Sequence, residues 1–163
     1  IMSKYPKKIE NVSIDYVKND NYDFHCEETN NNPKSLSSKN LSLHTTIQQT
    51  FLPLEKFSNI KILEKELSMD IKYASMIIQN PGSINVTHKD EFFYLKDKNR
   101  EKIRANIFLT DWDFGQLVET ECLTITRWKK YSAYVWDNNI AHFAINFSDI
   151  DKITLQFSGY SNE

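Results

Sequence analysis

Polar and apolar residues alternate along much of the second half of the chain. The clearest segment is 152–158, where polar Lys152, Thr154, Gln156 and Ser158 alternate with apolar Ile153, Leu155 and Phe157. Side chains of a strand point alternately to its two faces, so this segment is predicted to be a strand with one packed face and one polar face. Further strands are predicted at 72–79, 84–90, 102–109, 116–121, 123–126, 133–136 and 140–147. This series of short strands favours a mainly β fold, a jelly-roll barrel, over a helical one.

The first part of the chain has a different pattern. Residues 54–67 carry apolar side chains at helical spacing, which predicts one amphipathic helix or two short ones packed on the outer face of the barrel. Residues 12–17 are predicted to form a short strand, and the Asn-, Pro- and Ser-rich stretch at 30–38 a loop. We therefore expect a polar N-terminal extension over residues 1–40, which could fold over the barrel mouth, followed by the barrel domain over 41–163.

A candidate metal site lies on these strands. His88 and Asp90 are two residues apart and are expected to point to the same face of their strand, together with Ile84. His142 would come from a strand distant in sequence that the closed barrel brings alongside. Two imidazoles and one carboxylate bind one face of a ferrous ion and leave the opposite positions open. The His-x-Asp pair alone is weak evidence, because it also occurs by chance on solvated strands.

The strand after His142 strengthens this interpretation. Lys152 offers a positive charge and Thr154 a neutral donor on the same face, a combination that could hold a carboxylate of a ligand bound at the metal. The alternative is an edge strand with one solvated face.

Two further polar residues are candidates for the same site. Arg104 shares a strand face with Asn106 and Phe108, where it could neutralise a ligand carboxylate inside the barrel; the alternative is an exposed arginine on the outer face. Gln79 precedes the turn signal Pro81-Gly82 and could hydrogen-bond the ligand, or equally cap the loop.

The three tryptophans and the two remaining histidines are not predicted to form a further binding site. Trp112, Trp128 and Trp136 are expected to be packing residues, and Trp136 is also expected to help orient the metal ligands. His25, next to Cys26, and His44 fall outside the triad pattern. A structural zinc site needs four protein ligands, so we predict no second metal site at His25.

Residues 71–160 together resemble the iron(II)/2-oxoglutarate-dependent oxygenase superfamily, and within it the compact prolyl-hydroxylase-like proteins of marine bacteria and their phages. The matching pieces are Ile-Ile-Gln-Asn-Pro-Gly at 77–82, Thr-His-Lys-Asp at 87–90, Arg-Ala-Asn-Ile-Phe-Leu-Thr-Asp-Trp at 104–112 with Gly115, Val-Trp-Asp-Asn-Asn at 135–139, His142, and Lys-Ile-Thr-Leu-Gln-Phe-Ser-Gly at 152–159.

The resemblance implies a double-stranded β-helix (jelly-roll, cupin-like) barrel in which His88, Asp90 and His142 bind Fe(II). It also implies that 2-oxoglutarate chelates the metal and that its distal carboxylate is held by Lys152 and Thr154. Gln79 and Arg104 are the further candidate cosubstrate contacts. The implied enzyme is a dioxygenase that uses O2 and 2-oxoglutarate to hydroxylate a substrate and releases succinate and CO2. Many relatives carry arginine at the position of Lys152; lysine keeps the charge but loses the two-pronged geometry.

The resemblance makes a peptide or protein side chain the first substrate class to consider, with small molecules open. Two alternatives remain. One is a non-catalytic cupin-like binding or structural module that retains the metal site. The other, a cupin that uses its metal without a cosubstrate, is disfavoured by Lys152 and Thr154.

Composition adds limits to these expectations. The chain has 163 residues, which suits one barrel domain, and a net charge of −2 with both signs interspersed, so nucleic acid is a less favoured partner. No apolar run approaches membrane-spanning length and no signal-peptide pattern stands at the start. Cys26 and Cys122 are expected to be reduced thiols. We therefore expect a soluble protein of the cytoplasm of a bacterium or of a phage-infected host cell, with no membrane partner.

Overall fold

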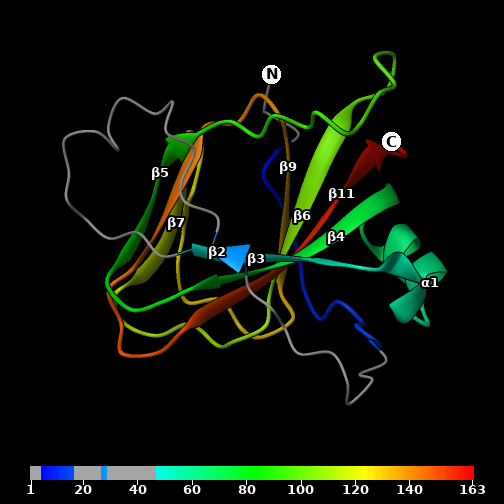
Figure 1. The fold of residues 1–163 in the computed structure, drawn as a ribbon. Helices are drawn as coiled ribbons and strands as arrows, with labels where there is room; N and C mark the ends of the chain where they lie inside the picture. The colour runs from blue at the N-terminus through cyan, green and yellow to red at the C-terminus, as the bar shows by residue number, and fades with distance from the viewer. Residues whose placement is uncertain (1–4, 17–26, 29–46) are drawn as a thin grey trace.

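Two antiparallel sheets packed face to face form the body of the protein (Figure 1). The computed structural model describes residues 5–16, 27–28 and 47–163. The larger sheet has seven strands, in the order β1 (Lys7–Ile9), β9 (Ala133–Asp137), β6 (Lys102–Phe108), β11 (Lys152–Ser161), β4 (Met69–Gln79), β3 (Ile47–Leu52) and β2 (Glu27–Glu28). The smaller sheet has four, in the order β5 (Ser83–His88), β10 (His142–Asn146), β7 (Gln116–Thr120) and β8 (Thr124–Ile125). The predicted mainly β jelly roll is confirmed.

The strands predicted from residue 72 onward are all present, with small shifts at their ends. In the described part of 12–17 the predicted strand is wrong, because only Tyr16 forms a bridge, to Phe57. The backbone N–H groups of Ser13 and Asp15 instead donate to the side chains of Glu66 and Asn59. These backbone N–H groups are thus satisfied by side-chain acceptors and not by a neighbouring strand.

Much of the hydrophobic core lies on the outer face of the larger sheet. The segment predicted to be helical forms two short helices, the 3-10 helix η1 (Leu54–Lys56) and α1 (Ile60–Glu66), and α1 lies against β4 in Figure 1. Leu63 is fully buried there, and the rings of Phe57 and Phe157 are 5.1 Å apart. Alternate residues of β6 and β11 complete this apolar layer: Ile103, Ala105, Ile107 and Leu155.

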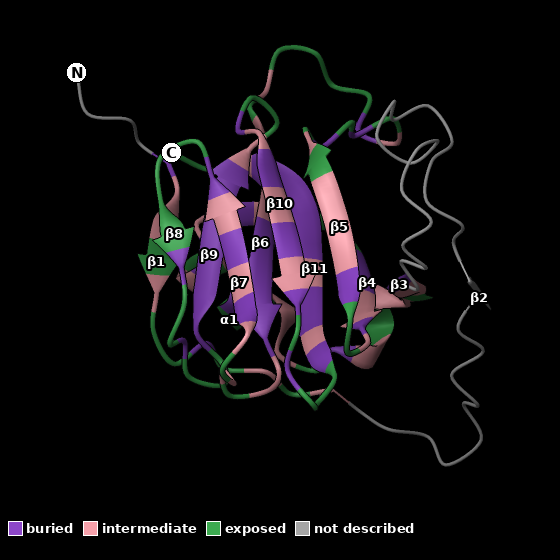
Figure 2. Ribbon diagram, turned by 90° about the vertical axis from the view of Figure 1, so that its left-hand side faces the viewer, coloured by how far each residue is buried: buried purple, intermediate pink, exposed green. Residues whose placement is uncertain are grey.

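The inner face of the same sheet is unusually polar. The strand register places Lys152 opposite Gln79, Gln156 between Ser75 and Asn106, and Ser158 between Tyr73 and Arg104. These rows face the smaller sheet, whose strands β7 and β10 bury alternate residues (Figure 2). Because the apolar layer lies outside, polar side chains can occupy the space between the sheets.

A break in register turns His88 into that space. His142 lies opposite His88, but Ala144 lies opposite Asn85, so β5 contains an extra residue between these two pairs. Such a bulge reverses the side-chain alternation on one side of it. Ile84 pairs with Ile145 on the opposite face, so the prediction that Ile84 shares the face of His88 is wrong.

The predicted N-terminal extension is described only in part. Its residues 5–16 include β1, which pairs with β9, and buried Val12. His25, Cys26 and His44 lie outside the described residues, and the idea that residues 1–40 cover the barrel mouth stays a prediction. Cys122 is an exposed free thiol. None of the helices in the described ranges is long and apolar enough to cross a membrane.

A glycine in β11 allows this strand to approach the backbone of β4 closely. A Cβ atom on Gly159 would lie 2.0 Å from the carbonyl oxygen of Asp70, at the register break next to Ser158.

We expect Gly159→Ala to lower the free energy of unfolding by about 3 kcal/mol or more, because backbone would have to move. Urea denaturation measures this. Gly82→Ala is the control: it meets no atom within 4 Å but has a φ of +79°, and it should cost about 1 kcal/mol. Equal, small losses in both variants would contradict the close approach.

Candidate metal centre

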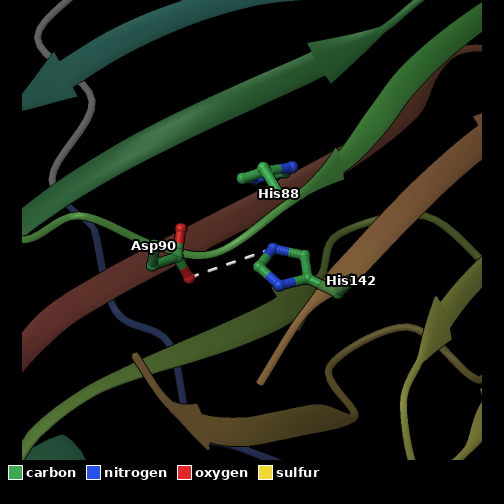
Figure 3. A group of neighbouring side chains, drawn as sticks. All are labelled: His88, Asp90 and His142. Carbon is green, nitrogen blue, oxygen red and sulfur yellow. Dashed lines mark ion pairs between the residues drawn. The ribbon is translucent and has the colours of Figure 1, made fainter. Parts of the chain in front are cut away.

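The three predicted metal ligands converge between the sheets (Figure 3). His88 ends β5, His142 begins β10, and their ring centroids are 4.3 Å apart. Asp90 stands in the loop after β5, not in the strand as predicted, and its Oδ2 is 3.9 Å from Nε2 of His142. One potential ligand atom from each residue lies within 4.8 Å of the other two. The triad is therefore brought together as the sequence predicted.

Backbone carbonyls set the orientation of both imidazoles. Nδ1 of His88 is 2.7 Å from the carbonyl oxygen of Val86, and Nδ1 of His142 is 3.1 Å from that of Ile140. A carbonyl oxygen can only accept, so each Nδ1 carries the proton and donates. The lone pair of each Nε2 is left for a metal, and each ring is held in the required tautomer.

Burial further prepares His142 for metal binding. Its pKa is held below the ordinary value, mainly by burial, and the attraction of Asp90 offsets this only in part. The ring also packs against Trp136, with ring centroids 4.9 Å apart. A neutral imidazole is the form that binds a metal, so this environment favours metal binding at neutral pH.

Asp90 is buried and its two oxygens have different partners. Oδ1 accepts a hydrogen bond from the guanidinium of Arg104, and Oδ2 accepts one of 3.3 Å from the indole N–H of Trp136. Oδ2 is also the oxygen that faces His142. The predicted role of Trp136 in orienting the ligands is confirmed by this contact.

A cavity runs from the two histidines into the barrel. Its walls include His88 and His142 as well as Gln79, Lys152 and Thr154. Five strands of the larger sheet, β3, β4, β6, β9 and β11, and three of the smaller sheet, β5, β7 and β10, supply its lining. The predicted cosubstrate contacts Gln79, Lys152 and Thr154 therefore share one space with the metal ligands.

The ammonium of Lys152 is the unusual charge in this cavity. The residue is 5% exposed, and desolvation by burial lowers its pKa from 10.5 to about 8. Nζ donates to Oε1 of Gln79 at 3.1 Å and lies 5.8 Å and 5.9 Å from the ring centroids of Phe108 and Trp128. Within the described ranges no carboxylate pairs with it. Cation–π contacts offset only part of the cost of burying a charge.

Two neutral groups in the same cavity also lack partners. The hydroxyl oxygen of Thr154 and Nδ2 of Asn106 are buried and, among the described residues, make no hydrogen bond. Gln156 donates to Oδ1 of Asn106 at 2.8 Å, which fixes the amide and leaves its nitrogen unpaired. Buried polar groups are normally satisfied, so an ammonium with no counter-ion among the described residues, together with an unpaired hydroxyl and amide nitrogen in the same cavity, points to an anionic ligand with several acceptor atoms.

The donor set therefore fits a metal and an anion. Two neutral nitrogens and one carboxylate oxygen suit a divalent first-row transition metal, and the cavity's unpaired donors suit a carboxylate.

The structure gives Gln79 and Arg104, two of the predicted cosubstrate contacts, defined hydrogen-bond partners that the sequence did not indicate. Gln79 is buried, and its amide nitrogen donates to the carbonyl oxygens of Ser83 and Ala144, so its oxygen is directed at Lys152. Arg104 faces inward, as one alternative held, but its guanidinium binds Asp90 and it does not line the cavity.

Three contributors were not assigned a role from the sequence. Asn106 lines the cavity, and the ring of Trp128 lies close to the Lys152 ammonium. Alternation along β6 already placed Asn106 on the same face as Arg104. Tyr94 lies in the loop after β5, where no periodic pattern marks it.

Comparison of the sequence with protein-family models and with curated proteins gives no match. Solved structures with a similar fold include the non-heme α-ketoglutarate-dependent carbocyclase SnoK from nogalamycin biosynthesis, with a TM-score of 0.57 and 10% identity over 74% of this chain and 66% of that chain. The chain thus spans slightly less than two thirds of SnoK.

Two prolyl hydroxylases have similar folds. The viral collagen prolyl hydroxylase of Paramecium bursaria Chlorella virus-1, solved with 2-oxoglutarate, gives a TM-score of 0.56 and 12% identity over 72% of this chain and 80% of that chain. A Pseudomonas putida prolyl-4-hydroxylase gives 0.51 and 12% over 72% of each. At these identities the likeness shows a shared jelly-roll fold.

The buried charge of Lys152 predicts a gain in stability when it is removed. With the pKa lowered to about 8, the folded state at pH 7 holds a charge that burial disfavours. Lys152→Met should therefore raise the free energy of unfolding of the ligand-free protein at pH 7 by about 1–2 kcal/mol. Wild-type stability should approach that of the variant as the pH rises from 8 to 10, because only the unfolded chain then keeps the proton.

Urea denaturation at pH 7 and pH 9.5 tests this expectation. Lys98→Met, which alters an exposed lysine, is the matched control and should change stability little at either pH. A Lys152→Met variant less stable than wild type at pH 7 would mean that the ammonium has an undescribed partner.

Proposed function

We propose that the protein is an Fe(II)- and 2-oxoglutarate-dependent dioxygenase that hydroxylates a peptide or protein side chain or a small molecule, releasing succinate and CO2. One observation carries the proposal. A single cavity is lined by the two histidines of a His-Asp-His triad, by a buried ammonium that has no carboxylate partner among the described residues, and by a buried hydroxyl that has no hydrogen-bond partner among them. A dicarboxylate that chelates a metal would satisfy both ends at once.

Each residue has a defined part in this scheme. Nε2 of His88, Nε2 of His142 and Oδ2 of Asp90 would hold Fe(II), and Lys152 with Thr154 would bind the distal carboxylate of 2-oxoglutarate. Gln79 directs the ammonium through its own amide, which two backbone carbonyls hold. The iron, the cosubstrate and O2 supply the oxidising chemistry, while the protein supplies ligation, orientation and exclusion of water.

The fold neighbours support this assignment at the level of the general reaction. SnoK is described as α-ketoglutarate-dependent, and two others as prolyl hydroxylases, one of them in complex with 2-oxoglutarate. Together they span small-molecule and protein substrates. Residues 1–40 would help to select the substrate if they fold over the barrel mouth, as the sequence suggested.

The binding of Fe(II) and 2-oxoglutarate tests the proposal directly. Under anaerobic conditions the wild type with both should show the weak visible charge-transfer band of the chelate. His142→Ala should lose the band, because a ligand atom is missing, whereas His44→Ala, outside the triad, should keep it. Thr154→Val, of nearly equal shape, should need about tenfold more 2-oxoglutarate for half-maximal absorbance, since it removes one buried hydrogen bond.

The absence of the band in the wild type would refute the oxygenase assignment. A band that forms but never leads, after O2 is admitted, to consumption of 2-oxoglutarate and release of succinate would instead favour the alternative, a non-catalytic cupin-like module that retains the metal site.

A further inference from the structure

Arg104 sits at the centre of a closed hydrogen-bond network beside the triad. Its side chain is 14% exposed. Nη1 donates to Oδ1 of Asp90, Nη2 donates to the hydroxyl of Tyr94 at 3.0 Å, and Nε donates to Oγ of Ser158 at 3.2 Å. The guanidinium carbon also lies 4.9 Å from the centroid of the Phe92 ring. Each of the three guanidinium nitrogens therefore donates a hydrogen bond.

The same network fixes the loop that carries Asp90. Tyr94 donates its own hydroxyl to Ser158 at 3.1 Å, so strand β11, the loop and Arg104 form a triangle of hydrogen bonds. Phe92 and Tyr94 come from this loop, which connects β5 with β6. The position of Asp90, which lies outside any strand, is thus held by side-chain contacts with Arg104 and Trp136 and not by a sheet register.

The network gives the two oxygens of Asp90 different functions. Oδ1 is taken by the guanidinium, whereas Oδ2 faces Nε2 of His142 at 3.9 Å. Because the guanidinium holds Oδ1 and orients the carboxylate, Oδ2 is the oxygen presented to a metal beside His142, and the indole N–H of Trp136 donates to the same Oδ2. Arg104 also offsets the negative charge of Asp90 in a poorly solvated place, where charges act on each other strongly.

We infer that Arg104 is a positioning and charge-balancing residue: it orients Asp90 so that Oδ2 faces the metal position and it offsets the charge of the carboxylate, so that a bound divalent ion keeps more of its charge for an anionic cosubstrate. The inference rests on the proposed function and assigns Arg104 to the metal side of the site, away from the carboxylate-binding end at Lys152. It makes a prediction that a purely structural role does not. Removing the charge should strengthen metal binding and weaken cosubstrate binding.

Arg104→Gln tests this because glutamine keeps an amide donor but removes the charge. At pH 7.5 and without O2, Mn(II) binding is measured by the loss of the free-ion EPR signal, and 2-oxoglutarate binding to the Mn(II)-loaded protein by calorimetry. We expect Mn(II) to bind at least about threefold tighter and 2-oxoglutarate at least about tenfold weaker than in the wild type. Arg104→Lys, which keeps the charge, should leave both affinities within about threefold of the wild type.

Arg100→Gln is the matched control. Arg100 also pairs with an aspartate, Asp70, at 2.7 Å and also lies over an aromatic ring, that of Tyr160, but it is outside the metal centre. It should change neither affinity. If Arg104→Gln does not fold, Arg104→Met carries the same expectation.

These measurements distinguish a failure of the proposed function from a failure of the inference about Arg104. A wild type that binds neither Mn(II) nor 2-oxoglutarate overturns the proposed function and this inference with it. A wild type that binds both, with both affinities falling together in Arg104→Gln, overturns the inference alone. Opposite shifts in Arg104→Gln, with near-normal values in Arg104→Lys, support it.

Discussion

The ammonium of Lys152 lies inside the barrel without a carboxylate partner in the part of the chain that the structure describes, and the surrounding residues are arranged around that charge. The ammonium donates to the side-chain oxygen of Gln79, and the rings of Phe108 and Trp128 lie close to it. The Thr154 hydroxyl in the same cavity has no hydrogen-bond partner among the described residues. A charge in this position costs folding free energy unless an anion binds. The cavity that joins it to the triad gives that anion a second point of attachment, which is why the metal centre and the lysine are best understood as one site.

The arrangement depends on where the protein keeps its hydrophobic core. Most two-sheet proteins fill the space between the sheets with apolar side chains. Here α1 and the N-terminal residues cover an apolar outer face, on which Leu63 and Phe157 are fully buried. The inner face is therefore free to carry charged and amide side chains without loss of a packed core. The Arg104 network makes a similar use of that face, holding Asp90, a candidate metal ligand that no strand register positions.

Much of this site could be predicted from the sequence because strand alternation is a local property. The residues on β11 were assigned to the correct face, and the types and order of the three ligands were sufficient to predict the triad. The errors fall where non-local contacts prevail. Ile84 was placed on the wrong face because nothing in the sequence marks the bulge in β5. Asp90 was placed in a strand because its partner Arg104, which holds it in a loop, comes from another strand.

The pKa of Lys152 tests the central claim most directly, because it reports whether the buried ammonium receives an anion. It can be followed by NMR titration of the labelled lysine side chain in Zn(II)-substituted protein, with and without 2-oxoglutarate. The ligand-free protein should titrate near a pKa of about 8, and 2-oxoglutarate should raise the pKa of Lys152 by at least about two units, because the bound carboxylate favours the charged form. An unchanged pKa in protein saturated with 2-oxoglutarate would contradict the account.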